Sequence, residues 1–120
     1  MPRSNVLLVA ADGERRHRWR LQLSDQGYAV FATGDTSVAL SWLARHGPQL
    51  VIADYLLPGT RIAIPHVLKH RGQRGIATIG VVADESLLTD RTRQLLGYDA
   101  LLTASTPAAL VSKRALQLRR

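Results

Sequence analysis

The sequence predicts an α/β protein in which five parallel strands alternate with five helices. Continuous apolar runs, which are typical of strands buried on both faces of a parallel sheet, occur at residues 6–11, 28–33, 49–54, 76–82 and 99–103. The segments between these runs space their apolar residues as helices do, and several of them end at a glycine. This alternation indicates a doubly wound sheet.

The first two strand–helix units have the clearest boundary signals. Asp12 is expected to cap the first helix, which runs to about residue 26 and is stopped by Gly27. Trp19 and Leu23 are four residues apart and are expected on the inward face of that helix. The second helix is expected over residues 36–45, before a His-Gly-Pro stop signal.

Three further helices are expected at residues 63–70, 86–96 and 106–120. The last of them begins with an N-cap, Thr106, followed by Pro107 at the first helical position, and it ends in Arg119-Arg120 at the negative end of the helix dipole. By analogy with the flavodoxin-like class, the expected strand order is 2-1-3-4-5. An open α/β sheet of this kind binds ligands at the carboxyl ends of its strands.

The size of the chain fits a single domain over residues 1–120. The sequence has no cysteine, which excludes disulfides and thiolate metal sites and suits a cytoplasmic location. The apolar run near the N-terminus is too short to span a membrane, so no membrane contact is expected. Neither a Gly-rich dinucleotide fingerprint nor a P-loop follows the first strand, which disfavours nucleotide cofactors of those kinds.

The net charge of +7 raises the question of nucleic-acid binding. The first helix carries Arg15, Arg16, Arg18 and Arg20 around Trp19. Helical spacing turns Trp19 toward the core and predicts that the arginines face water, as on an ordinary solvated surface. We therefore expect no direct nucleic-acid contact from this domain.

The segment 49–59 contains the most informative single residue, Asp54. It is an apolar strand that ends on this carboxylate and continues into a Leu-Pro-Gly turn at Pro58-Gly59. Asp54 is therefore expected at the carboxyl end of a buried strand, where the sheet presents its functional groups.

This segment resembles the phosphoacceptor strand of bacterial response-regulator receiver domains, in which an aspartate is followed by three mostly apolar residues, a proline and often a glycine. The resemblance extends over the chain through Val6-Leu7-Leu8-Val9, Gly27-Tyr28 and the stretch from Asp90-Arg91 to Leu102. It implies the receiver fold, with Asp54 at the phosphoacceptor position.

Several other positions depart from the receiver pattern. The two acidic residues that hold Mg²⁺ in receivers fall on Ala10 and Ala11, the switch hydroxyl falls on Val82, and the lysine after the fifth strand falls on Ala104. The aromatic switch position falls on Leu101, and the Asp-Gly after the Leu-Pro turn falls on Arg61-Ile62.

These departures remove the positive charge and metal ligands on which phosphoryl transfer depends. Mg²⁺ binding is expected to be lost or weak, no other cofactor is expected, and Asp54 is interpreted as a vestigial phosphoacceptor in a domain that is not an enzyme. Asp12 lies one step beyond Ala11 and is an alternative metal ligand, although a helix cap is the preferred interpretation. His66 and His70 have a metal-binding spacing, but without a third ligand we interpret them as surface residues.

The leading functional hypothesis is a pseudo-receiver of a two-component-type signalling protein, which works without phosphorylation by contacting a protein partner or an attached output domain. The resemblance implies an interaction face, and a homodimer contact, on the fourth helix, fifth strand and fifth helix. Its charged residues are Asp90, Arg91, Arg93, Asp99, Lys113 and Arg114.

Two other functions remain open at this point. The first is a sensor of an anionic ligand such as a cyclic dinucleotide, contacted by Arg91, Arg93 and Tyr98, because arginine pairs with phosphate and tyrosine stacks on bases. The second is an ordinary receiver that is phosphorylated on Asp54, with Asp12 as a metal ligand.

Overall fold

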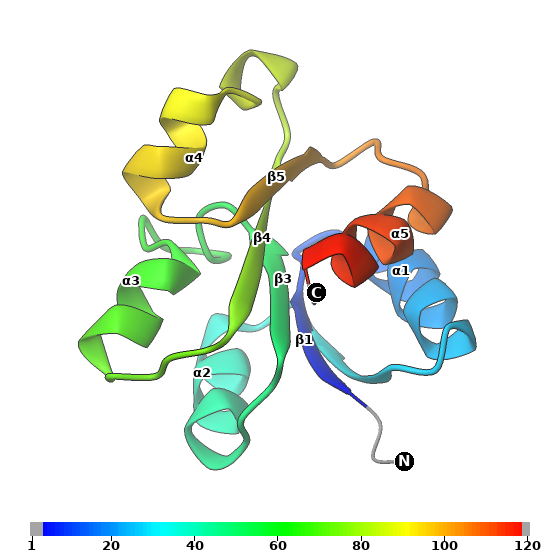
Figure 1. The fold of residues 1–120 in the computed structure, drawn as a ribbon, viewed down its shortest axis with the longest axis horizontal. Coiled ribbons are helices and arrows are strands. Elements are labelled where there is room, and N and C mark those ends of the chain that lie inside the picture. Colours follow the sequence, from blue (N-terminus) through cyan, green and yellow to red (C-terminus); the bar gives the residue numbers. More distant parts are fainter. Residues whose placement is uncertain (1–3, 119–120) are drawn as a thin grey trace.

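A single parallel sheet of five strands runs through the centre of the protein, in the order β2-β1-β3-β4-β5 (Figure 1). The computed structural model describes residues 4–118. The strands are β1 (Asn5–Val9), β2 (Ala29–Thr33), β3 (Leu50–Asp54), β4 (Ala77–Val82) and β5 (Ala100–Thr103). The predicted fold class and strand order are confirmed.

Helices cover both faces of the sheet, with α1 and α5 on one face and α2, α3 and α4 on the other (Figure 1). They are α1 (Gly13–Asp25), α2 (Thr36–Arg45), α3 (Ile64–His70), α4 (Asp90–Leu96) and α5 (Ala108–Leu118). A short 3₁₀ helix, η1 (Glu85–Leu87), precedes α4. Among residues 4–118, no helix combines the length and apolar character that crossing a membrane requires.

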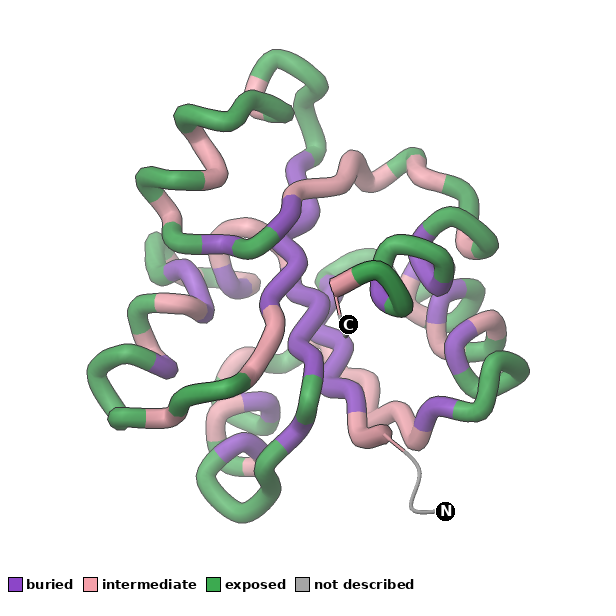
Figure 2. Tube along the Cα trace, viewed as in Figure 1, coloured by how far each residue is buried: buried purple, intermediate pink, exposed green. Residues whose placement is uncertain are grey.

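The core has two halves because successive side chains of a strand point to opposite faces of the sheet. Val6 and Leu8 of β1 pack with Trp19 and Leu23 of α1 in one half, which confirms the predicted inward face of α1. In the other half, the intervening strand residues pack against α2 and α3. The buried residues accordingly follow the strands and the inner helix faces (Figure 2).

Most element boundaries agree with the predictions to within one or two residues. Asp12 caps α1 as expected, because its side chain accepts hydrogen bonds from the backbone N–H groups of Glu14 and Arg15. The second helix has its predicted bounds. The predicted Arg119-Arg120 end of the last helix lies outside the described residues.

One predicted helix is wrong in its first half. Residues 86–96 were expected to form a single helix, but the structure separates η1 from α4. Thr89 interrupts the helix: its backbone is extended, and its side chain accepts a hydrogen bond from the Thr92 N–H, so it is the N-cap of α4. An apolar spacing that includes Leu88 suggested continuity, yet this side chain is 45% exposed and supplies no packing to maintain it.

Candidate functional site

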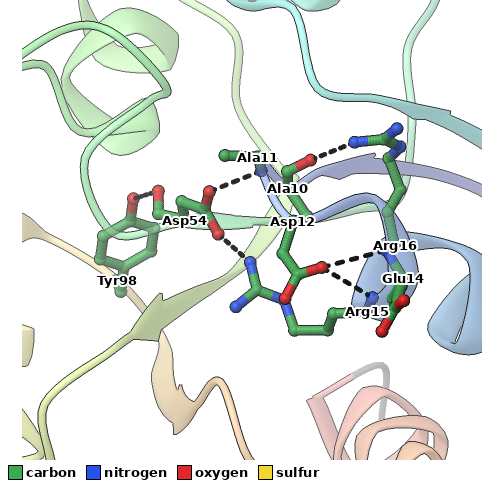
Figure 3. Close-up of polar contacts among 8 residues, drawn as sticks. All are labelled: Ala10, Ala11, Asp12, Glu14, Arg15, Arg16, Asp54 and Tyr98. Carbon is green, nitrogen blue, oxygen red and sulfur yellow. Dashed lines mark hydrogen bonds and ion pairs between the residues drawn. The ribbon is translucent and has the colours of Figure 1, made fainter.

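Asp54 lies at the carboxyl end of β3, and both of its carboxylate oxygens have partners within the chain (Figure 3). Oδ2 accepts a hydrogen bond from the Ala11 N–H at 2.9 Å. Oδ1 forms an ion pair with the Arg15 guanidinium, which donates from Nη2. The Asp54 side chain is 18% exposed, so this carboxylate is partly withdrawn from water.

The second member of the pair, Arg15, comes from the first turn of α1. Arg15 is only 7% exposed, and its guanidinium carbon lies 5.3 Å from the centre of the Trp19 ring. Its side chain therefore lies between the inward face of α1 and the end of β3. The prediction that Arg15 faces water is wrong, whereas Arg18 is exposed as expected.

A second guanidinium from the same turn points toward these strand ends. Nη1 of Arg16 donates a hydrogen bond of 2.6 Å to the carbonyl oxygen of Ala10, directly after β1 (Figure 3). Gly34 permits this approach, since a Cβ at that position would lie 2.6 Å from the same nitrogen. The site thus contains two cations supplied by the chain itself, Arg15 and Arg16. Because Arg16 is half-buried, the prediction that it faces water is wrong as well.

The positions that would carry metal ligands and the switch hydroxyl have only methyl groups or branched hydrocarbon. Ala10 and Val82 are buried, Ala11 is exposed and Ala104 is half-buried. The Ala104 N–H donates to the Val82 carbonyl oxygen at 2.9 Å, so these two positions are joined by their backbones alone.

The donor set does not fit Mg²⁺. Asp54 is the one carboxylate at the metal position, and it is already paired with a guanidinium. The Asp12 carboxylate is turned to the start of α1, where the hydrogen bond from the Arg15 backbone N–H is the main cause of its lowered pKa. Within residues 4–118, no three His, Cys, Asp or Glu side chains form a group that could hold a metal ion.

Tyr98 anchors the segment before β5 beneath the same strand ends. Its ring is 1% exposed, and its hydroxyl donates to the Tyr55 carbonyl oxygen at 2.8 Å. Burial raises the pKa of this phenol. A Cβ at Gly80 would lie 2.8 Å from two carbons of the ring, so β4 accommodates Tyr98 because it has glycine there. No motif in the sequence indicates this packing.

The burial of Tyr98 corrects the predicted anionic-ligand contacts. A ring with this exposure has no free face on which a nucleotide base could stack. Arg93 is also engaged, since it pairs with Asp90 at 2.8 Å and donates to the Tyr98 carbonyl oxygen at 3.1 Å. Of the three predicted contacts, Arg91 alone is exposed.

The residues of the predicted interaction face are distributed over α4, the start of β5 and α5. Besides the Asp90–Arg93 pair, Asp99 accepts a hydrogen bond from the Thr78 N–H at 2.8 Å. Lys113 and Arg114 are exposed on α5. His66 and His70 are exposed on α3, as expected. Use of this face by a partner or a second copy stays a prediction.

Similar folds occur among solved structures. A response-regulator receiver domain of Francisella has a TM-score of 0.84 and 17% identity, with 97% of this chain and 96% of that chain covered. The chemotaxis response regulator CheY4 of Vibrio cholerae has a TM-score of 0.83 and 16% identity, with 98% and 99% covered. An orphan response regulator of H. pylori has a TM-score of 0.81 and 14% identity, with 99% and 100% covered.

Sequence comparisons give no corresponding relationship: no family model and no curated protein sequence matches this chain significantly. The likeness is one of fold, a five-stranded parallel sheet in the order β2-β1-β3-β4-β5 alternating with five α-helices. The neighbouring structures match the chain over nearly all of its length. The chain has the fold of CheY-like response-regulator receiver domains.

Proposed function

We propose that this domain is a phosphorylation-independent, receiver-like module of a bacterial two-component-type signalling protein, and that it acts by contacting a protein partner or an attached output domain. The observation that supports this proposal is the Arg15–Asp54 ion pair. It places a permanent cation of the chain against the carboxylate at the phosphoacceptor position.

Phosphoryl transfer requires a carboxylate oxygen that can attack the phosphorus atom and positive charge around the transferring group. At Asp54, one oxygen is bound by the Arg15 guanidinium and the other by the Ala11 N–H. The methyl groups at Ala10 and Ala11 supply no metal ligand, and Val82 and Ala104 supply no hydroxyl or ammonium. We therefore expect Asp54 to be unreactive, and the domain not to catalyse its own phosphorylation.

The ion pair also suits a module with one constant conformation. A guanidinium remains charged throughout the physiological pH range. The pair therefore connects the start of α1 to the end of β3 without a metal ion or a phosphoryl group. Regulation would then come from which partner is present and not from chemistry at Asp54.

The proposal is tested by treating the ¹⁵N-labelled protein with Mg²⁺ and either acetyl phosphate or beryllofluoride. The expected result is an unchanged intact mass after acetyl phosphate, and no NMR shifts at Asp54 or Ala11 with beryllofluoride, because Arg15 occupies the carboxylate. An active receiver treated in parallel verifies the reagents, and the Asp54→Asn variant controls for modification elsewhere. Phosphorylation of Asp54, or shifts centred on it, would contradict the proposal.

A further inference from the structure

The helices α3 and α4 lie on the same face of the sheet (Figure 1). Residues at both helices line a groove. Its volume is about 920 Å³, and its walls are formed by Pro65, His66, Lys69, His70, Gln94, Leu95, Leu96 and Gly97. A second hollow of about 310 Å³ shares Pro65, Lys69 and Gly97 with it and continues toward the start of β4. Together they form an elongated surface feature, which we call the α3–α4 groove.

The α4 wall of this groove is apolar and uncovered. Leu95 is 69% exposed, more than any other large apolar side chain in the described part of the chain. None of the seven residues of α4 is buried, so this helix presents Leu95 to the groove and not to the core. Leu95 therefore offers exposed apolar surface directly beside the hollow.

The α3 wall is basic. His66, Lys69 and His70 are exposed along one helix, and Arg74 lines the second hollow. No acidic side chain lines the larger hollow, and Asp99 is the one acidic residue that lines the smaller. Within a protein of net charge +7, this wall attracts negatively charged segments.

The dimensions of the groove suit a short segment of polypeptide. Each of its two helices has seven residues, which corresponds to a length of about 10 Å. That is the length of about two turns of a helix, which present an apolar residue and two or three acidic residues together. The apolar wall and the basic wall face such a segment at the same time.

We propose that the α3–α4 groove docks an acidic, amphipathic segment of a partner protein, with an apolar side chain packed on Leu95 and carboxylates against His66, Lys69 and His70. This inference rests on the proposed function, because it names the kind of partner that the domain contacts. The groove differs from the predicted charged face: Asp90, Arg93, Asp99 and Arg114 line another hollow together, and of these four only Asp99 also lines the α3–α4 groove.

The proposal is tested by titrating the ¹⁵N-labelled protein with a synthetic helical peptide of leucines on one face and glutamates on the other. A peptide with lysine in place of each glutamate serves as the charge control. The expected result is saturable shifts at Lys69, Leu95 and Gly97 with the acidic peptide alone, and weaker binding at higher salt.

Two variants and two matched controls examine the surface itself. Leu95→Asp and Lys69→Glu are each expected to weaken binding of the acidic peptide at least tenfold. Leu21→Asp on α1 repeats the first change, and Arg45→Glu on α2 reverses a positive charge as the second does; both positions are exposed and outside the groove. Both controls are expected to bind as the unchanged protein does.

The absence of shifts with the acidic peptide, equal binding of the lysine peptide, or shifts confined to another surface would overturn the proposal. Self-association that Leu95→Asp abolishes would assign the groove to a second copy and overturn it as well. Treating the same labelled sample with beryllofluoride distinguishes a failure of this proposal from a failure of the proposed function. If the peptide does not bind and the NMR signals at Asp54 do not shift, only the docking proposal is refuted. If the signals at Asp54 shift, the proposed function is refuted.

Discussion

At the scale of single residues, the Arg15–Asp54 pair determines the character of the site. A carboxylate and a guanidinium lose hydration when they are buried together, so the pair contributes net stability only through good geometry and additional hydrogen bonds. Asp54 has such a bond from the Ala11 N–H, whereas Arg15 Nε is buried with no hydrogen-bond partner among the described residues. The pair is therefore expected to fix the local conformation more than to raise the total stability.

Removing one member of the Arg15–Asp54 pair is expected to lower the free energy of unfolding more than removing both. Arg15→Met is expected to lower the free energy of unfolding by about 2–3 kcal/mol, because it leaves the half-buried Asp54 carboxylate without its countercharge. Adding Asp54→Asn should recover part of this loss. Urea unfolding at pH 7 measures both effects, and Arg18→Met at an exposed position of α1 is the control. A stability of Arg15→Met equal to that of Arg18→Met would show that the pair has no such role.

The sequence predicted the missing ligands at this site but not the residue that compensates for them. Ala10, Ala11 and Val82 are identified by matching the chain to the receiver pattern. The prediction that all four arginines of α1 face water fails at Arg15, which is four residues before Trp19 and so shares the inward face of α1 with Trp19 and Leu23. Because Cα–Cβ bonds in a helix tilt toward its N-terminus, a long side chain in the first turn reaches the strand ends beside it. The four-residue spacing of Arg15 from Trp19 therefore indicates that Arg15 points inward.

At the scale of elements, α4 differs from the other four α-helices because it contributes no buried residue to the core. Leu96 packs against one core half while remaining half-buried, and the Thr89 cap holds the first turn. The boundary between η1 and α4 could not be predicted from apolar spacing, since no burial enforces it. Caps and local hydrogen bonds maintain this element more than packing does.

Amide hydrogen exchange measured by NMR should reveal this difference. Elements with few buried apolar contacts open locally at low free energy, so the α4 amides are expected to exchange at least tenfold faster than the amides of α2, which buries Ala39 and Leu43. The central strands β1 and β3 provide the reference for the slowest exchange. Equal protection of α2 and α4 would contradict the interpretation that α4 is held mainly by its cap.

At the scale of the whole molecule, the fold was predictable because it depends on averaged properties. Apolar periodicity, with glycines and caps at the ends of elements, predicts the alternation of strands and helices, and the strand order follows by analogy with the flavodoxin-like class. The similar solved structures have this fold at 14–21% identity. Contacts between particular side chains, such as those of Arg15 and Tyr98, depend on the three-dimensional placement of the elements. Patterns in the sequence do not specify that placement accurately enough to predict individual hydrogen bonds.

The stability of the whole molecule is expected to fall in acid. The pKa values of Asp12, Asp35 and Asp84 are lowered, chiefly by hydrogen bonds from the Arg15 N–H, the Ser37 hydroxyl and the Ser86 N–H, respectively. A lowered pKa stabilises the fold above the unfolded-state value of about 3.9, and this contribution is lost as the pH falls through the folded-state value. Protonation also increases a net charge that is already +7 at neutral pH.

The urea midpoint is therefore expected to change little between pH 7 and about pH 5 and to decrease below about pH 4. The triple variant Asp12→Asn, Asp35→Asn and Asp84→Asn is the matched comparison, because asparagine caps helices without titrating. It should be less sensitive to acid than the unchanged protein. The same acid dependence in both proteins would show that these three caps are not the cause.

The close packing of Tyr98 on Gly80 also constrains how the sequence can have changed over time. A Cβ at position 80 would lie 2.8 Å from the Tyr98 ring, so a larger residue there requires the ring or the strand to move. The two positions are therefore expected to change together. Among homologues of this chain, an aromatic residue at position 98 should be found only together with glycine at position 80.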